Sequence, residues 1–358
     1  MSKWLQQEWQ RNSPWQIVLR PLAWLFGALA ALRRALYRSG LATSTRLPVP
    51  VIVVGNISVG GAGKTPLVIA LVEVLRRAGL HPGIVSRGYG AVADDHGEFA
   101  GAVLQSNLQG VAAPDWFGDE PVMMAARLGC PVFVGRDRPR IALALLTSHP
   151  EVDVIISDDG LQHYALRRDI EIAVVDGERG SGNGQLLPAG PLREPEARLA
   201  EVDMVVVNAG KTASLPSIAA GAVPRFSMRL GNERFVMLQE GARPQPTQFE
   251  AQEFAQRSAG RNIHAVAGIG NPRRFFEHLR ALGVSFTAHT FPDHHAFTAR
   301  DLRLPSAEVV LMTEKDAVKC GAFADERMWF MRIDALLPAA FDEQLLALLD
   351  TADGRKTA

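Results

Sequence analysis

Short, continuous runs of apolar and mostly β-branched residues dominate the chain between residues 50 and 208. The runs lie at 50–55, 83–86, 131–135, 152–157, 170–176 and 204–208. Because they are apolar at successive rather than alternate positions, they are typical of strands buried on both faces of a sheet. Stretches with helical periodicity, at 66–78 and 137–148, separate some of them. This alternation predicts β-α-β units and a doubly wound, mostly parallel α/β sheet.

The first run leads into a loop of small residues, VGNISVGGAGKTP at 54–66, and a helical stretch follows at once. Ligands of such sheets bind beyond the carboxyl ends of the strands, where this loop is expected to lie. The loop matches the phosphate-binding pattern G-x-x-x-x-G-K-[ST], except that Ser58 occupies the position of the first glycine. The predicted phosphate-binding residues are Ser58, Gly60, Gly61, Ala62, Gly63, Lys64 and Thr65.

The residue types in this loop suit a nucleoside triphosphate. Glycine is needed where a backbone that wraps around phosphates adopts positive φ and approaches them without a Cβ. Lys64 is expected to reach the β- and γ-phosphates, and the Thr65 hydroxyl is expected to bind Mg²⁺. The alternative, a glycine turn with an exposed lysine, is disfavoured because strand, loop, Gly-Lys-Thr and helix occur in register. We therefore expect ATP and Mg²⁺ as cofactors.

Two adjacent acids, Asp158 and Asp159, end the apolar run in VDVIISDDG. Carboxylates that close a buried strand are unfavourable for packing but suit a cation. The sequence therefore predicts that this pair organises Mg²⁺ near the loop. Asp-Asp-Gly is also typical of a turn or a helix cap, which is the alternative.

Other polar clusters follow strands or precede helices. SRGYG carries Arg87, PAGPLREP carries Arg193, and GDEP places Asp119 and Glu120 before a helical stretch, where they could also serve only as an N-terminal cap. FPDHHAF contains His294 and a second histidine directly after it. Adjacent side chains diverge on an extended chain, so the two histidines are not expected to share a metal.

Residues 1–46 differ from the rest of the chain. They hold seven basic residues against one acidic residue, and four of the six tryptophans. Apolar residues recur at helical spacing from Trp15 to Leu32 with arginines on the opposite side, which predicts an amphipathic, cationic helix. The uncharged run 21–32 would be about 18 Å long, too short to cross about 30 Å of hydrocarbon, and no signal-peptide cleavage site closes it. We expect residues 1–36 to lie in an anionic membrane surface, with a helix docked on the core as the alternative.

The predicted organisation is an N-terminal helical region, a P-loop domain, a second, smaller α/β domain and a tail, at 1–46, 47–210, 211–350 and 351–358. Within the third region, VPRFSMRLG and RFVMLQEG predict two strands joined around Gly231 and Asn232 that link the domains. A second set of strands and helices follows.

Charge and cysteine content exclude some functions. The formal net charge is zero and the pI is about 7.1, so no global basic field indicates a nucleic-acid partner. Cys130 and Cys320 lie far apart and do not form a metal-binding spacing. A reducing, cytosolic compartment is the simplest interpretation, and no protein partner is inferred.

Taken together, the motifs resemble the tetraacyldisaccharide 4′-kinase family of lipid A biosynthesis over almost the whole chain. They are VGNISVGGAGKTP, SRGYG, GDEP, DDGLQH, GNGQLLPAGPLREP, FPDHHAF and TEKDAVK, in this order. The loop alone is shared by many nucleotide enzymes, whereas GNGQLLPAGPLREP together with DDGLQH is specific. In this family a small hydroxyl residue normally stands at the position of Ser58, so the missing glycine belongs to the family's own loop.

The resemblance implies transfer of the γ-phosphate of ATP to the 4′-hydroxyl of tetraacyldisaccharide 1-phosphate, giving lipid IVA. It also implies a location at the cytoplasmic face of the bacterial inner membrane. The implied roles are general base for Asp119 with His294 of the second domain as its partner, Mg²⁺ organisation for Glu120, Asp158, Asp159 and Thr65, phosphate contact for Lys64, and phosphate or sugar binding for Arg87 and Arg193.

Two other classes of protein remain open. A P-loop ATPase acting in targeting or assembly would also use a cationic amphipathic helix and would need no acceptor. A small-molecule kinase or an amide-forming enzyme on the same fold would not need the helix. Lipid-independent ATP hydrolysis would favour the first class, and activity that survives removal of residues 1–36 would favour the second.

Overall fold

The computed structural model describes residues 8–9, 14–88, 117–210, 220–238 and 247–354. The chain forms two compact units. The larger unit comprises residues 1–86, 137–230 and 335–358, and the smaller unit comprises residues 87–136 and 231–334. This division differs from the predicted boundaries, because residues 87–136 group with the smaller unit and the chain returns to the larger unit after residue 334.

A parallel sheet forms the centre of the larger unit, in the order β2-β4-β1-β5-β6-β7. Its strands are β1 (Val51–Gly55), β2 (Pro82–Ser86), β4 (Val154–Asp158), β5 (Ile170–Asp176), β6 (Met204–Asn208) and β7 (Arg225–Met237). The first five are buried along their whole length, as expected for strands covered on both faces. The predicted mostly parallel α/β fold is confirmed.

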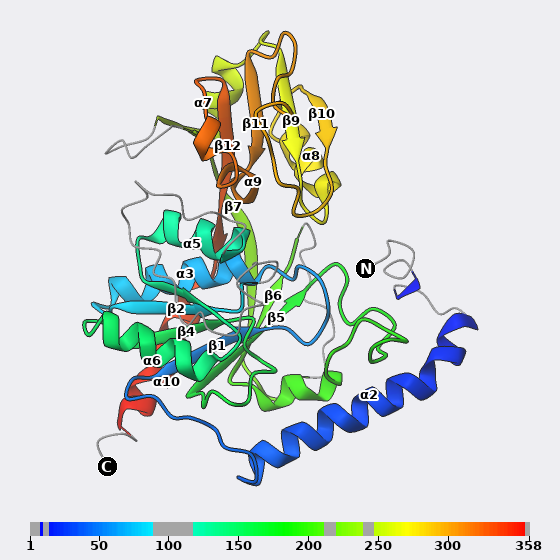
Figure 1. Cartoon of the computed structure of the whole chain (residues 1–358), viewed down its shortest axis with the longest axis vertical. Helices are drawn as coiled ribbons and strands as arrows, with labels where there is room; N and C mark the ends of the chain where they lie inside the picture. Colours follow the sequence, from blue (N-terminus) through cyan, green and yellow to red (C-terminus); the bar gives the residue numbers. More distant parts are fainter. Residues whose placement is uncertain (1–7, 10–13, 89–116, 211–219, 239–246, 355–358) are drawn as a thin grey trace. The chain divides into compact units, whose positions relative to one another are not determined.

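Helices α3 (Lys64–Arg77), α6 (Arg138–Ser148) and α10 (Ala339–Gly354) belong to the same unit (Figure 1). α3 begins directly after Gly63, whose φ of 96° lies in the left-handed region that favours glycine. One face of α3 is fully buried through residues four positions apart, namely Leu67, Leu71 and Leu75. α10 continues past residue 351, where a tail had been predicted.

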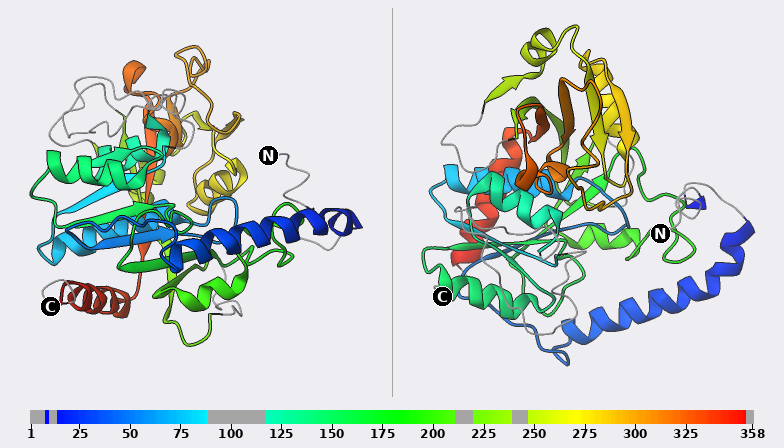
Figure 2. Two further views of the ribbon diagram at one scale, coloured as in Figure 1. Left: turned by 60° about the horizontal axis from the view of Figure 1, so that its bottom comes forward. Right: turned by 45° about the horizontal axis from the view of Figure 1, so that its top comes forward.

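Helix α2 (Pro14–Arg38) is one continuous helix that runs outside the strands of the sheet in the views of Figures 1 and 2. Its 25 residues correspond to about 37 Å at about 1.5 Å per residue. It is long and apolar enough to cross a membrane by length and composition, with 11% of its most apolar window buried. The uncharged run at 21–32, which by itself is too short to span, is part of this longer helix.

Most large side chains on the apolar side of α2 are exposed to solvent. Its large side chains are more than half exposed at Trp15, Ile17, Val18, Leu22, Trp24, Leu25, Leu29 and Leu32. Burying an apolar face is the main gain when a helix docks on a core. The exposed face therefore disfavours the docked-helix alternative.

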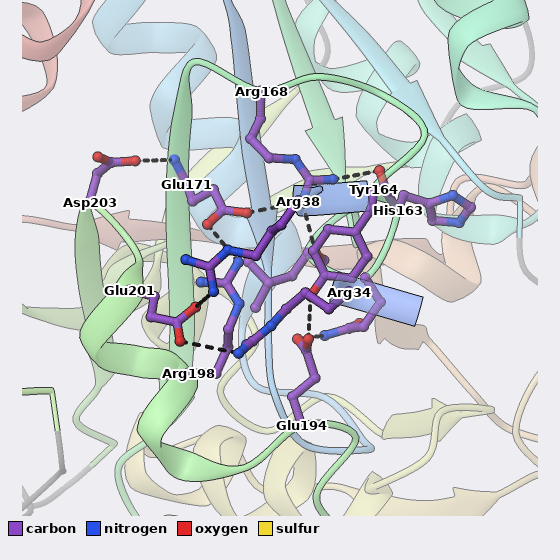
Figure 3. Close-up of polar contacts among 12 residues, drawn as sticks. Arg34, Arg38, His163, Tyr164, Arg168, Glu171, Glu194, Arg198, Glu201 and Asp203 are labelled. Atoms are coloured by element: carbon purple, nitrogen blue, oxygen red, sulfur yellow. Dashed lines mark hydrogen bonds and ion pairs between the residues drawn. The ribbon is translucent and has the colours of Figure 1, made fainter. Parts of the chain in front are cut away.

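Arginines near the end of α2 attach it to the larger unit. Arg34 and Arg38 pair with the two carboxylate oxygens of Glu201 at 3.1 and 3.4 Å, as Figure 3 shows. Nearby, the buried Arg198 pairs with Glu171 at 2.6 Å. The end of α2 is thus attached to the larger unit through its polar side.

The smaller unit contains a second sheet in the order β10-β9-β11-β12-β7, with β8 antiparallel to β7. The helices and strands whose residues belong wholly or mostly to the smaller unit are α5 (Asp119–Leu128), β3 (Val132–Val134), β8 (Gln248–Glu250), α7 (Ala251–Arg257), β9 (Ile263–Ala267), α8 (Pro272–Ala281), β10 (Thr287–Thr290), β11 (Val309–Thr313), α9 (Glu314–Ala317) and β12 (Met328–Leu336).

Side chains on the two faces of β12 enter two separate apolar clusters. Trp329 and Met331 pack with Phe235 and Phe254, whereas Met328 and Phe330 pack in the cluster of the opposite face. This alternation is the two-residue period of a strand. The sheet of the smaller unit is therefore covered on both faces.

The predicted pair of strands around Gly231 and Asn232 was wrong. β7 is a single strand that continues through these residues. Its first part pairs with β6 and its last part with β8, and Asn232 adopts a positive φ of 53° within it. A single residue with positive φ distorts a strand locally but does not reverse it. The two parts of β7 pair with different strands and not with each other, so they do not form a hairpin.

Candidate active site

The phosphate-binding loop connects β1 to α3. Gly60 and Gly63 adopt φ values of 100° and 96°. A Cβ built on Gly63 would lie 2.6 Å from Nδ2 of Asn208, so no other residue fits there. Ser58 forms an isolated bridge with Leu192, and the amide of the next residue donates to the Pro191 carbonyl at 2.8 Å. The loop thus opens in an extended conformation, which explains why glycine is not needed at Ser58.

Lys64, at the first position of α3, is mostly buried and has two partners. Its Nζ donates to Oδ1 of Asn56 at 3.2 Å and pairs with Oδ1 of Asp159 at 3.3 Å. The register of β1 and β4 brings this about, because Val54 lies beside Asp158. The acids that end β4 are therefore neighbours of the loop that follows β1, as the sequence predicted for a parallel sheet.

Asp159 lies in a constrained turn between two cations. Its φ of 46° is unusual for a residue other than glycine, and its carboxylate pairs with Nη1 of Arg193 at 3.3 Å as well as with Lys64. Burial alone would raise the pKa of Asp159, but Lys64 and Arg193 outweigh this effect and hold the pKa below its usual value. Asp159 is therefore ionised at neutral pH.

The fully buried Arg138 donates hydrogen bonds to the same turn. Its Nη1 donates to Oγ of Ser157, and its Nη2 donates to the carbonyl of Asp159 at 3.4 Å. The carboxylate of Asp158 is also buried and accepts a hydrogen bond from Oγ of Ser86 at 3.0 Å. Packed side chains thus position both acids.

Three of the predicted Mg²⁺ ligands, Thr65, Asp158 and Asp159, lie at the same end of the larger unit's sheet. Glu120 is exposed and lies in the smaller unit. Among the described residues, no group of three or more acid, histidine or cysteine side chains forms a preassembled metal cluster. The oxygen donors at the ends of β4 and at the start of α3 nevertheless fit Mg²⁺, which is held by few protein carboxylates together with the oxygens of phosphate groups.

The second polar group is built in the smaller unit. Asp119 is the first residue of α5, and its Oδ2 lies 3.0 Å from Nδ1 of His294. His294 has a φ of 59°, and its amide donates to the carbonyl of Gly268 at 3.2 Å. Asp119 is buried whereas the His294 side chain is 39% exposed. The two residues belong to one compact unit, and not to two domains as predicted.

Two lysines also face Asp119. Nζ of Lys319 lies 3.7 Å and Nζ of Lys315 3.9 Å from Oδ2 of Asp119. Burial would raise the pKa of Asp119, but the His294 hydrogen bond and the two ammonium charges hold the pKa below its usual value. His294 therefore orients an ionised carboxylate and lowers its pKa.

Arg127, near the end of α5, holds the helix in the smaller unit. Its guanidinium donates to Glu314 and to the carbonyl of Ile333, both at 3.0 Å, and pairs with Asp334. The Arg127 side chain is only 6% exposed. These contacts explain why residues 87–136 group with 231–334: α5 carries Asp119 at one end and is fixed to the smaller unit at the other.

Comparisons with known proteins show the family of the chain. The family model for tetraacyldisaccharide-1-P 4′-kinase matches residues 15–350. The chain belongs to this family. It is 50% identical over 348 residues to the tetraacyldisaccharide 4′-kinase of Methylobacillus flagellatus, covering 97% of this chain and 96% of that protein. It is 51% identical over 341 residues to the tetraacyldisaccharide 4′-kinase of Azoarcus sp. strain BH72, covering 95% and 94%.

A solved structure of the family has the same fold. The crystal structure of the "apo" form of LpxK from Aquifex aeolicus in complex with ATP superimposes with a TM-score of 0.75 and is 27% identical. The match covers 93% of this chain and 99% of that chain. The resemblance drawn from the motifs is therefore confirmed at the level of family and fold.

The structure places the remaining predicted residue and adds others. Arg87 is exposed and directly follows β2, and the residues after Gly88 in SRGYG lie outside the described residues. Sequence reasoning missed Lys315 and Lys319, although the TEKDAVK motif that holds them is among those that mark this kinase family. Polar residues within such a motif were the signal that could have found them.

Proposed function

We propose that the chain transfers the γ-phosphate of ATP to the 4′-hydroxyl of tetraacyldisaccharide 1-phosphate, giving lipid IVA. Membership of the tetraacyldisaccharide-1-P 4′-kinase family supports the reaction. The observation that carries the proposal is the glycine-rich loop with Lys64 between the ends of β1 and β4, since this is the arrangement with which P-loop enzymes hold β- and γ-phosphates.

In the proposed reaction, the loop residues Ser58, Gly60, Gly61, Ala62 and Gly63 surround the phosphates of ATP. The ammonium of Lys64 moves from Asp159 to the phosphate oxygens. Arg193, which already pairs with Asp159, and Arg87 bind phosphate or sugar oxygens. These contacts offset the negative charge of the transferred group, which is the largest contribution that a protein makes to phosphoryl transfer.

Mg²⁺ would be held in the larger unit by Thr65, Asp158 and Asp159. When bound, it would neutralise charge on the β- and γ-phosphates. Once Lys64 contacts the phosphates, the ionised carboxylate of Asp159 has an oxygen available for a cation.

Asp119 is the proposed base for the acceptor hydroxyl. Its carboxylate is ionised and can accept a hydrogen bond from the 4′-hydroxyl, and His294 keeps it in place from the other side. A carboxylate with a lowered pKa is a weak base, so it takes the proton late, as the acceptor oxygen bonds to phosphorus and the bond to ADP breaks. This suits phosphoryl transfer, in which bond formation to the nucleophile lags behind departure of the leaving group.

Helix α2 is proposed to place the enzyme at the cytoplasmic face of the bacterial inner membrane, where the acylated acceptor resides. The exposed tryptophans, leucines and valine on α2 would enter the lipid, and its arginines would meet anionic head groups. The carboxylate of Glu201 keeps the last two of these arginines at the protein side.

The test is a phosphotransfer assay with purified protein, Mg²⁺, γ-labelled ATP and tetraacyldisaccharide 1-phosphate in detergent micelles. We expect label in the lipid, lost in Asp119→Ala and in Lys64→Ala. The absence of labelled lipid from folded, ATP-binding protein would refute the proposal. Release of labelled phosphate at a useful rate without lipid would favour an ATPase instead.

A further inference from the structure

Side chains bind three successive carbonyl groups of the phosphate-binding loop. Nδ2 of Asn56 donates to the carbonyl of Gly60 at 3.4 Å. Nη2 of Arg179 donates to the carbonyl of Gly61. Nδ2 of Asn208 donates to the carbonyl of Ala62 at 3.2 Å. None of these three donor residues was predicted from the sequence as part of the site.

The three donors come from the ends of three adjacent strands. Asn56 directly follows β1, Asn208 is the last residue of β6, and Arg179 follows Asp176, the last residue of β5. These strands are neighbours in the order β1-β5-β6. Asn208 therefore lies on the sheet itself, and Asn56 and Arg179 lie in the short segments that follow its strands.

Each donor is itself fixed. Asn56 and Asn208 are 0% and 3% exposed. Arg179 is held by the buried carboxylate of Asp176, whose Oδ2 accepts from Nε of Arg179 at 2.9 Å. The other oxygen of Asp176 accepts the backbone amides of Glu178 and Arg179, both at 3.0 Å. The buried carboxylate of Asp176 thus orients the guanidinium of Arg179 toward the loop.

The glycines of the loop are fitted to these donors. A Cβ on Gly60 would lie 2.9 Å from Nη1 of Arg179, and a Cβ on Gly63 would lie 2.6 Å from Nδ2 of Asn208. The side chains and the loop therefore pack closely, and the requirement for glycine comes partly from the donors and not only from the phosphates.

Fixing a carbonyl also fixes the amide of the following residue. In a trans peptide the C=O of one residue and the N–H of the next point in opposite directions. Holding the carbonyls of Gly60, Gly61 and Ala62 toward Asn56, Arg179 and Asn208 therefore directs the amides of Gly61, Ala62 and Gly63 to the opposite side of the loop. Amides arranged in this way form the concave anion site of a phosphate-binding loop.

We infer that Arg179 and Asn208 are positioning residues of the nucleotide site: they hold the loop carbonyls outward, so that the loop amides already face the phosphates before ATP binds. The inference rests on the proposed ATP-dependent function. It predicts that the two residues contribute to binding of the β- and γ-phosphates and not to binding of the adenosine part.

The experiment measures the dissociation constants of ATP and AMP by titration calorimetry, with Mg²⁺ held constant. Asn208→Asp keeps the size of the side chain but removes its donor and places a negative charge beside the Ala62 carbonyl. Arg179→Met removes the guanidinium, and because that side chain is 43% exposed its replacement does not disturb the core. We expect ATP binding to weaken about tenfold or more in each variant, in line with the loss of one hydrogen bond and its preorganisation, while AMP binding changes less than about twofold.

Two controls separate positioning from general destabilisation. Asn262→Asp removes an amide donor to the Ser306 carbonyl in the smaller unit and should leave both dissociation constants unchanged. Arg179→Lys, which restores a donor without the planar fork, should recover part of the ATP affinity. Hydrogen exchange at the amides of Gly61, Ala62 and Gly63 should be faster in Asn208→Asp and Arg179→Met without nucleotide.

Each outcome decides the inference. Equal weakening of ATP and AMP, or wild-type ATP affinity in both variants, would overturn it while leaving the proposed kinase intact. A wild-type protein that binds ATP no better than AMP would instead refute the phosphate site itself, and the inference would fall with it.

Discussion

Replacing Arg127 by methionine is expected to free α5 without unfolding the protein. Methionine has a similar length and apolar stem but leaves Glu314 and Asp334 without one partner each. Breaking a buried ion pair commonly costs about 3–5 kcal/mol. Here each acid keeps a second arginine, since Arg332 pairs with Glu314 at 2.9 Å and Arg234 with Asp334 at 2.7 Å. We therefore expect a loss of about 2 kcal/mol, which is borne mainly by the contacts of α5.

The measurement is hydrogen exchange of the α5 amides in the full chain. A loss of about 2 kcal/mol should accelerate exchange of amides protected by the α5 contacts about 30-fold. The rest of the smaller unit's sheet should change little, because its aromatic core does not include Arg127. Turnover should fall at the same time because Asp119 is the first residue of α5, whereas ATP affinity should stay within about twofold, since the loop lies in the other unit.

The matched control is Arg257→Met. Arg257 also pairs with an acid, Glu253 at 2.9 Å, but its side chain is 61% exposed, so the pair contributes little. Exchange and turnover should match those of the wild type. If α5 exchanges at the wild-type rate in Arg127→Met, the argument that these ion pairs hold α5 is incorrect.

Three further outcomes are expected. Asp119→Ala should lower kcat at least about 100-fold while the dissociation constant of ATP changes by only a few fold; near-normal turnover would remove Asp119 as the base. Trp24→Glu combined with Leu25→Glu should abolish co-flotation with anionic vesicles and leave activity on a micellar substrate largely intact; unchanged flotation would contradict the membrane role of α2. Burial and the neighbouring Glu194 raise the pKa of Tyr164 from 10.0 to about 12. Because the folded state holds the phenol proton more tightly than the unfolded state does, the contribution of Tyr164 to stability is fully present below pH 10, the pKa in the unfolded state, and is lost as pH rises toward 12. Tyr164→Phe should therefore flatten the fall in the free energy of unfolding across that pH range in chemical unfolding. An equally steep fall would exclude Tyr164 as its source.

The sheet of the larger unit could be predicted because its signals are local. Apolar runs at 50–55 and 170–176 became β1 and β5 with ends shifted by at most one residue. Gly63 and Lys64 indicated the start of α3, because a glycine that can adopt positive φ stands directly before the first residue of the helix. Such features depend on the chain's immediate neighbours and not on tertiary context.

The grouping of the units and the supports of the site could not be predicted because they depend on contacts between distant segments. Nothing near Arg127 in the sequence indicates that it pairs with Asp334, more than 200 positions away. Gly231 and Asn232 favour a turn by residue type, but pairing with β6 before these residues and with β8 after them keeps β7 continuous. Asn208 was counted as the end of an apolar run, and its role at Ala62 follows only from the order of β1, β5 and β6.

Each of the two sets of reactive groups is held together by contacts within a single unit. Lys64, Arg193 and Asp159 contact one another in the larger unit, and Asp119 contacts His294 in the smaller unit. Substitutions that act on separate sets should therefore combine additively in their effects on nucleotide affinity and on turnover. Residues of one set should not combine in this way: once Asp119 is replaced, His294 has no carboxylate to orient, so His294→Ala should cost much less in kcat in an Asp119→Ala background than in the wild type. Full additivity of that pair would show that His294 acts on the reaction independently of Asp119.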